Sequence, residues 1–134
     1  MQSNNAYIVT ACDKQRFFPF RLLDPAENPD EVRRDVKEGG FLGFKPYLNY
    51  VRKADPNQVE IHEMLPADIM RIADDLGLIV MLHIPRKQRL ADPLNQSQIV
   101  ELCQSHPNAR IVLAHIGRAY YLKNVVGHLS LIHI

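Results

Sequence analysis

The stretch Leu78-Ile-Val-Met-Leu-His83-Ile-Pro85 decides the fold of this chain. It runs through five apolar residues to one ionisable residue, His83. A short continuous apolar run of this kind is typical of a strand covered on both faces, as in a parallel sheet. Two further stretches have the same form: Phe41-Leu-Gly-Phe-Lys45-Pro-Tyr47 and Ile111-Val-Leu-Ala-His115-Ile-Gly117. The sequence therefore predicts parallel strands that each end in an ionisable residue.

Helical patterns alternate with these strands. Ile69, Ile72, Ala73 and Leu76 have the i, i+3, i+4, i+7 spacing of an amphipathic helix. The sequence from Asn28 through Pro29 to Glu31 is typical of a helix start. The remaining expected elements are a helix within Asn4 to Lys14, a strand from Phe17 to Leu23, a helix with Ile99 and Leu102, and a last helix with Leu122, Val125 and Val126.

This alternation predicts an α/β fold. The strand ends at Lys45, His83 and His115 recur roughly 30 to 40 positions apart, as strand–helix units do. Such units build either a β/α barrel or a doubly wound sheet. No Gly-x-Gly-x-x-Gly sequence opens a predicted helix, so the dinucleotide-binding version loses support. We expect a partial (β/α)8 TIM barrel, because a whole one takes roughly 250 residues and this chain has 134.

Composition narrows the class of function. The hydrophobic fraction of 46% and charged fraction of 23% are typical of a soluble globular domain. The net charge of +1 gives no electrostatic basis for binding nucleic acid or a membrane surface. No apolar run approaches the ~20 residues of a membrane-spanning helix. Without a secretory signal, Cys12 and Cys103 are expected to be reduced thiols of a cytoplasmic protein. The expected partner is a small-molecule substrate.

The last six residues, Leu129-Ser-Leu-Ile-His-Ile134, break the pattern. They read like the translation of a transposon-end adapter used to prepare sequencing libraries. We therefore expect residues 1–128 to be a partial metal-dependent hydrolase barrel and residues 129–134 to be a non-native tail, of a truncated reading frame. The alternative is a genuine short strand.

His83 and His115 are the first candidate site residues. They end neighbouring strands, and the carboxyl ends of parallel barrel strands open on one face. Imidazole is a common ligand of zinc and a general base near neutral pH. A single buried histidine more often has its ring satisfied by a backbone carbonyl, but two such residues at corresponding positions favour a metal or proton-transfer site.

Three further residues belong to the same predicted rim, and each has two interpretations. Lys45 either extends to solvent or contacts an anionic substrate. Tyr47 either hydrogen-bonds a substrate or is an ordinary surface residue. Arg118, which follows Gly117 at a predicted helix start, either pairs with a substrate carboxylate or is an ordinary surface arginine.

A basic loop of Arg86, Lys87 and Arg89 follows the His83 strand. It could act as a lid that attracts anions. A solvated loop is the interpretation we favour from sequence.

The chain resembles the amidohydrolase superfamily in its amidohydrolase-2 branch of metal-dependent hydrolases. The stretches that carry the resemblance are Arg16-Phe-Phe-Pro-Phe-Arg-Leu-Leu-Asp-Pro25, Gly40–Tyr47, Met81–Pro85 and Asn108–Gly117. The resemblance covers essentially all of residues 4 to 126. It implies a distorted (β/α)8 barrel with one or two divalent metals at the carboxyl rim, zinc being the expected ion. The strands of this chain would be the third to the sixth.

The resemblance also implies roles for single residues. His83 would be the metal ligand of the fifth strand. His115 would be a second ligand in binuclear members, or would polarise or deprotonate the metal-bound water in mononuclear ones. Lys45 would take the place of a carbamylated lysine that bridges two metals. The His-x-His pair of the first strand is expected upstream of Met1, and the aspartate of the eighth strand downstream of the chain's end.

The implied reaction is hydrolysis of an amide, ester or lactone bond by metal-activated water. Non-oxidative decarboxylation within the same superfamily is the alternative. A third hypothesis is a catalytically inactive truncated fragment, which is the interpretation we favour for the isolated chain, whereas hydrolysis is the one we favour for the intact parent protein. In such a fragment the outer edges of the first and last strands would be unpaired, which favours self-association into a homo-oligomer.

Overall fold

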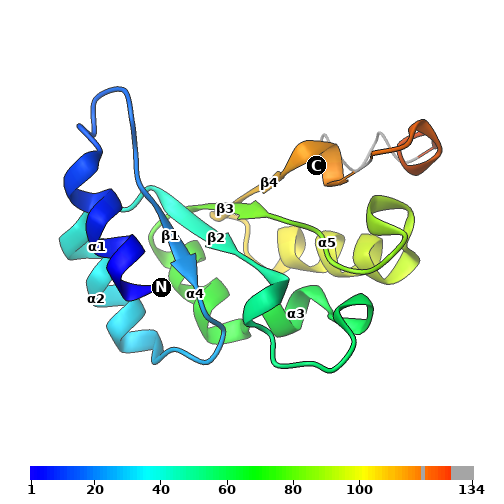
Figure 1. Ribbon diagram of the computed structural model, residues 1–134, viewed down its shortest axis with the longest axis horizontal. Coiled ribbons are helices and arrows are strands. Elements are labelled where there is room, and N and C mark those ends of the chain that lie inside the picture. The colour runs from blue at the N-terminus through cyan, green and yellow to red at the C-terminus, as the bar shows by residue number, and fades with distance from the viewer. Residues whose placement is uncertain (119, 128–134) are drawn as a thin grey trace.

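The computed structural model describes residues 1–118 and 120–127. Four strands form one parallel sheet in the order β1-β2-β3-β4 (Figure 1): β1 (Phe20–Leu23), β2 (Gly43–Pro46), β3 (Ile79–Leu82) and β4 (Arg110–Leu113). Each strand therefore lies next to its neighbour in the chain. A doubly wound sheet would reverse this order at a switch point, so the alternative to a barrel is excluded for this sheet.

Helices connect the strands. They are α1 (Gln2–Ala11), α2 (Pro29–Gly39), α3 (Ile61–Met64), α4 (Ala67–Asp75), α5 (Pro93–Ser105) and α6 (His115–Arg118). One-turn 3-10 helices are η1 (Leu48–Tyr50), η2 (Pro56–Gln58), η3 (Arg89–Ala91) and η4 (Leu122–Asn124). No helix in the described ranges is long and apolar enough to cross a membrane.

The core lies between the sheet and α2, α4 and α5, which gather on one side of the strands (Figure 1). Buried side chains of the strands pack there against buried side chains of these helices: Leu23, Phe44, Val80 and Leu82 against Val32, Ile69 and Ile99. Strands in chain order with helices on one face are the arrangement of a (β/α)8 barrel wall. The structure thus confirms a partial TIM barrel.

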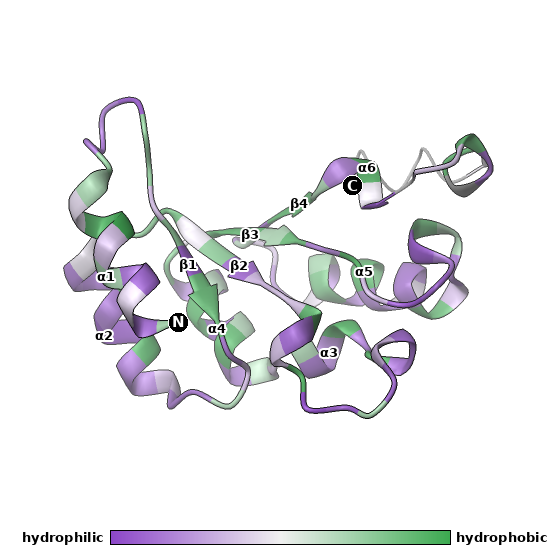
Figure 2. Ribbon diagram, viewed as in Figure 1, coloured by the Kyte–Doolittle hydropathy of each residue, from purple (hydrophilic) through white to green (hydrophobic). Residues whose placement is uncertain are grey.

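The opposite face of the sheet would line the barrel interior. The strand register aligns Leu22 with Lys45 and Met81 with Val112 on this face. Val112 is 44% exposed. Figure 2 shows β3 in green, whereas much of α1 and α2 is purple. The apolar strands are therefore covered by helices on one face only, within the part of the chain that the structure describes.

Local signals explain where α2 begins and ends. The Asn28 side chain accepts a hydrogen bond from the Asp30 amide at 2.9 Å, and Pro29 occupies the first helical position. Gly40 ends the helix with a left-handed φ of 63°. The predicted start of this helix is confirmed.

The last predicted helix is wrong for the described residues. After β4 the chain forms the short turn α6 and then the single turn η4. Leu122 is 79% exposed and Val126 is 61% exposed. A regular helix at this position would need an apolar surface on which to bury these side chains, and the described residues provide none. His128 and the tail Leu129–Ile134 lie outside the described residues.

The outer edge of β1 is partly covered, contrary to expectation. The Asn5 side chain, on α1, donates a hydrogen bond to the Leu22 carbonyl oxygen at 3.1 Å and accepts one from the Leu22 amide at 2.9 Å. Asn5 is only 7% exposed. Its amide group thus takes the place of a neighbouring strand at one residue, which protects this edge from pairing with another chain.

Candidate active site at the carboxyl ends of the strands

The structure brings the predicted site residues together. Lys45 lies in β2, His83 directly follows β3, and His115 begins α6, with one residue between it and the end of β4. The ring centroids of His83 and His115 are 5.6 Å apart, edge to face, and those of His83 and Tyr47 are 5.8 Å apart. Lys45 Nζ lies 3.0 Å from Met81 Sδ and 5.7 Å from the centre of the Tyr47 ring.

His83 is held in its neutral form. Burial lowers its pKa to about 4, and the positive charges of Arg118, His115, Lys45 and Arg89 contribute further. Its Nδ1 is buried and has no hydrogen-bond partner among the described residues. The ordinary interpretation, in which a backbone carbonyl satisfies the ring, therefore does not hold for this nitrogen. A neutral imidazole with a free nitrogen is the form that binds a metal ion.

A cavity of about 380 Å³ opens beside His83. Its lining residues are Tyr47, Leu48, Asn49, Pro56, Asn57, His83, Arg86, Arg89 and Arg118. Among the described residues, the lining thus contains three arginines and no acidic residue.

Arg86 and Arg89 line the site, although the interpretation favoured from sequence left them out of it. The favoured interpretation, a solvated loop, is wrong for both because both are partly buried and line the cavity. Lys87, between them, is exposed and does not line it. The available signal was the position of these basic residues directly after the carboxyl end of a strand, where α/β proteins bind ligands.

The first turn of α5 positions this loop. Asp92 caps the helix and accepts a hydrogen bond from Arg86 Nε at 3.0 Å. Asn95 Nδ2 donates to the Pro85 carbonyl oxygen at 3.0 Å and to the Arg89 carbonyl oxygen at 2.7 Å. The two ends of the basic loop are therefore attached to one rigid helix.

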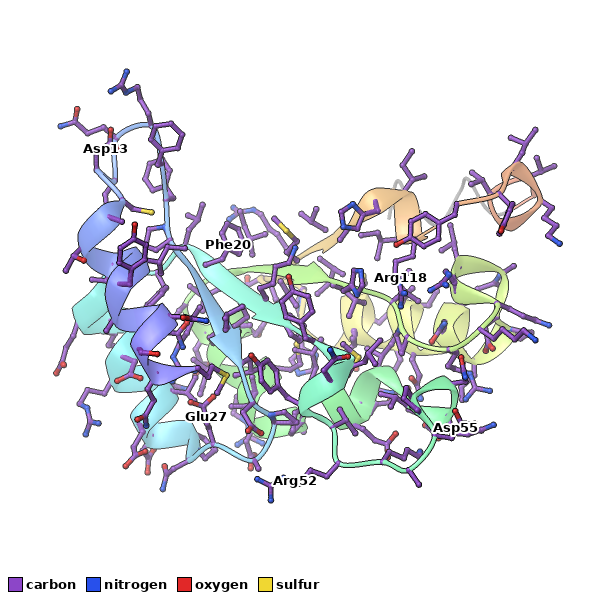
Figure 3. All side chains as sticks on the ribbon, in the orientation of Figure 1. Asp13, Phe20, Glu27, Arg52, Asp55 and Arg118 are labelled. Atoms are coloured by element: carbon purple, nitrogen blue, oxygen red, sulfur yellow. The ribbon has the colours of Figure 1, made fainter. Side chains whose placement is uncertain are left out.

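Arg118 joins the turn α6 to the segment that follows β3. Its Nη1 donates to the Ile84 carbonyl oxygen at 3.0 Å, and Figure 3 shows Arg118 beside the loop that follows β3. The turn can approach closely because Gly117, at φ +64°, has no Cβ; an added one would lie 3.0 Å from Leu90 Cβ. Arg118 Nε is buried without a partner in the described residues.

Left-handed backbone conformations concentrate around the cavity. Arg86, Arg89, His115 and Arg118 have φ values of 60°, 56°, 54° and 55°. Such a conformation costs a non-glycine residue roughly 1–2 kcal/mol. Strained residues of this kind tend to cluster at functional sites.

The model of a family described as amidohydrolase matches residues 1–133. The chain belongs to the amidohydrolase family. Neither the search of curated proteins nor the search of solved structures gave a match. Membership supports a metal-dependent hydrolase or decarboxylase type of function, because this superfamily generally uses divalent metals.

The described residues of this amidohydrolase fit part of a metal centre. His83 and His115 bring two imidazole rings together, and the unpartnered Nδ1 of His83 is available to a ligand. A catalytic zinc ion usually has three protein ligands. No group of three or more His, Cys, Asp or Glu residues able to hold a metal occurs within residues 1–118 and 120–127.

Proposed function

We propose that this amidohydrolase takes part in metal-dependent hydrolysis of an amide, ester or lactone bond, with the reacting centre at His83 and His115. One observation carries the proposal: two imidazoles meet at the carboxyl ends of neighbouring parallel strands, and one has a buried nitrogen with no partner among the described residues. Family membership supports the same class of reaction.

Each predicted residue has a role in this proposal. His83 would hold the metal ion through its neutral imidazole. His115 would be either a second ligand or a base that accepts a proton from water. When bound, zinc, the expected ion, supplies Lewis acidity and lowers the pKa of water toward ~7.

Lys45, Tyr47 and Arg118 surround this pair. Lys45 is partly buried and close enough to lower the pKa of His83. As an ammonium group it would contact an anionic substrate; carbamylated, and so negatively charged, it would instead bridge two metal ions. Tyr47 and Arg118 line the cavity and would orient the substrate.

Decarboxylation is the alternative reaction. The specific observation in its favour is the cavity with three arginines beside His83. A carboxylate held there would lie next to the proposed reacting centre. A catalytically inactive chain remains the third hypothesis.

Small molecules are the proposed partners, and the proposed location is the cytoplasm. Cys12 and Cys103 are both free thiols in the structure. This arrangement is compatible with a reducing compartment.

An activity assay tests the proposed function. The chain is loaded with zinc and incubated with esters, lactones, amides and aromatic carboxylic acids. Acid release at constant pH is recorded for the esters and lactones, amine release for the amides and carbon dioxide release for the acids. We expect release that a chelator abolishes, that His115→Ala abolishes and that His62→Ala leaves intact, because His62 lies outside the cavity. Carbon dioxide as the product would favour the decarboxylase. No turnover under any condition would favour the inactive chain.

A further inference from the structure

The positive charge at the cavity is only partly balanced by protein groups. Arg86 pairs with Asp92 at 3.0 Å. Arg89 and Arg118 have no carboxylate partner within the described residues; the Arg89 guanidinium lies 5.0 Å from the centre of the Tyr120 ring. Two guanidinium groups therefore face a small cavity without a counter-ion from the part of the chain that the structure describes.

One unpartnered hydrogen-bond donor beside this cavity also indicates that an anion binds there. Arg118 Nε is buried and makes no hydrogen bond to the described residues, although its Nη1 bonds the Ile84 carbonyl oxygen. Buried polar groups in folded proteins almost always have a partner. A bound group with acceptor oxygens would supply the missing one.

The backbone conformation around the cavity indicates a structurally defined binding site and not a flexible surface. Arg86, Arg89 and Arg118 all have left-handed backbone conformations. The loop that carries Arg86 and Arg89 is held at Pro85 and Arg89 by Asn95, which is fully buried. Residues keep such conformations only where the surrounding structure enforces them.

We infer that the cavity binds an oxyanion of the substrate, a carboxylate or a phosphate, through Arg89 and Arg118. The planar guanidinium group presents donors that match two oxygens of such an anion. A volume of about 380 Å³ is in the range of small-molecule sites. The inference rests on the proposed function in one respect: the anion would anchor a substrate whose reacting bond lies beside His83 and His115.

Binding of simple anions to the metal-free full chain tests this inference. The probes are benzoate, phenyl phosphate and the neutral benzamide, and the readout is the NMR shift of the arginine Nε–H signals with added probe. We expect benzoate, phenyl phosphate or both to shift the signals of Arg89 and Arg118, and benzamide to leave them in place. The tighter of the two anions identifies the oxyanion.

Matched variants locate the site. Arg89→Gln and Arg118→Gln should each weaken anion binding by about tenfold or more, because each loses a charge-assisted hydrogen bond. Lys87→Gln removes the same charge from the same loop at an exposed position and should change binding less than about twofold. Arg118→Lys keeps the positive charge but loses the planar guanidinium group with its paired donors, so this variant should bind the anion more weakly than the unmodified chain.

Several outcomes would overturn the inference. The first is that benzamide binds as tightly as benzoate. The second is that Lys87→Gln weakens anion binding as much as Arg89→Gln does. The third is that a chain whose spectrum shows a folded protein binds neither anion. Because Arg118→Gln also removes the hydrogen bond to the Ile84 carbonyl oxygen, Arg89→Gln is the decisive variant.

The failure of this inference can be distinguished from the failure of the proposed function. The assay contains no metal, so anion binding without zinc-dependent turnover would contradict the proposed function alone. Zinc-dependent hydrolysis without anion binding would contradict this inference alone.

Discussion

At the scale of single residues, the state of His83 decides what the site can do. Its pKa is lowered to about 4 by burial and by nearby positive charges, against about 6.5 in an unfolded chain. Between these values the unfolded state binds more protons than the folded state. The contribution of His83 to the free energy of unfolding is therefore unchanged above pH 6.5 and falls as the pH drops toward 4.

A histidine ring titration tests this state. In the metal-free chain we expect the ring nitrogens of His83 to remain those of a neutral imidazole at pH 6, as measured by NMR. Arg118→Gln should raise the pKa of His83, because it removes the largest charge effect on this ring. A midpoint near 6.5 in the unmodified chain would contradict the account.

Asn5 is a second residue with a specific role. Asn5→Ala would leave the amide and carbonyl groups of Leu22 without their side-chain partner. We expect the free energy of unfolding to fall by about 1–3 kcal/mol, measured by urea denaturation. Asn4→Ala, at an exposed position of the same helix, is the control and should change it by less than about 0.5 kcal/mol. Equal effects of the two changes would argue against the edge-covering role.

The sequence predicts which residues at the strand ends belong to the candidate site better than it predicts which loop residues do. His83, His115, Lys45 and Tyr47 follow apolar runs, so their place at one rim follows from strand order. Arg86 and Arg89 reach the cavity through hydrogen bonds made by Asp92 and Asn95. No local pattern in the loop reveals such bonds.

At the scale of elements, the loop after β3 and the start of α5 act as one unit. Asn95→Ala would remove the donors to the Pro85 and Arg89 carbonyl oxygens. We expect a loss of about 1–3 kcal/mol in the free energy of unfolding and weaker binding of the anion probe. Gln104→Ala, exposed on the same helix, is the control. Retained anion binding in Asn95→Ala would show that the loop does not depend on this residue.

Helix α2 and the segment after β4 differ in how far their sequences determine them. α2 has its own cap, a proline at its first position and a glycine end, so the sequence predicts it closely. The turn α6 is instead left-handed at His115, Ile116, Gly117 and Arg118. It depends on the close packing of Gly117 against Leu90 and Ile84, which sequence periodicity does not encode.

At the scale of the whole molecule, the sheet carries helices on one face only within residues 1–118 and 120–127. Apolar strands in a parallel sheet are normally covered on both faces. The face with Met81 and Val112 is uncovered in the described structure. The fold class is predictable from sequence because it follows from the order of elements and the apolar runs. The reaction is not, because it depends on groups that meet only in the folded site.

Because this face of the sheet is uncovered in the described structure, we expect the chain to self-associate. We expect the sedimentation coefficient of the chain to rise with protein concentration. Val112→Lys should reduce this rise because it places a charge on the uncovered face. Tyr7→Lys, at a residue of α1 that is 73% exposed, is the matched control and should leave the rise unchanged. A chain that stays monomeric at all concentrations would contradict the expectation.

Zinc binding at His83 and His115 tests the central claim most directly. Zinc is added to the metal-free chain, and the ring signals of all its histidines are followed by NMR. The account predicts that the signals of His83 and His115 shift together and saturate at one zinc per chain, while His62 and His106 stay in place. His83→Ala should remove the shift of His115. Zinc that binds at other histidines, or that leaves both site histidines unshifted, would contradict the account.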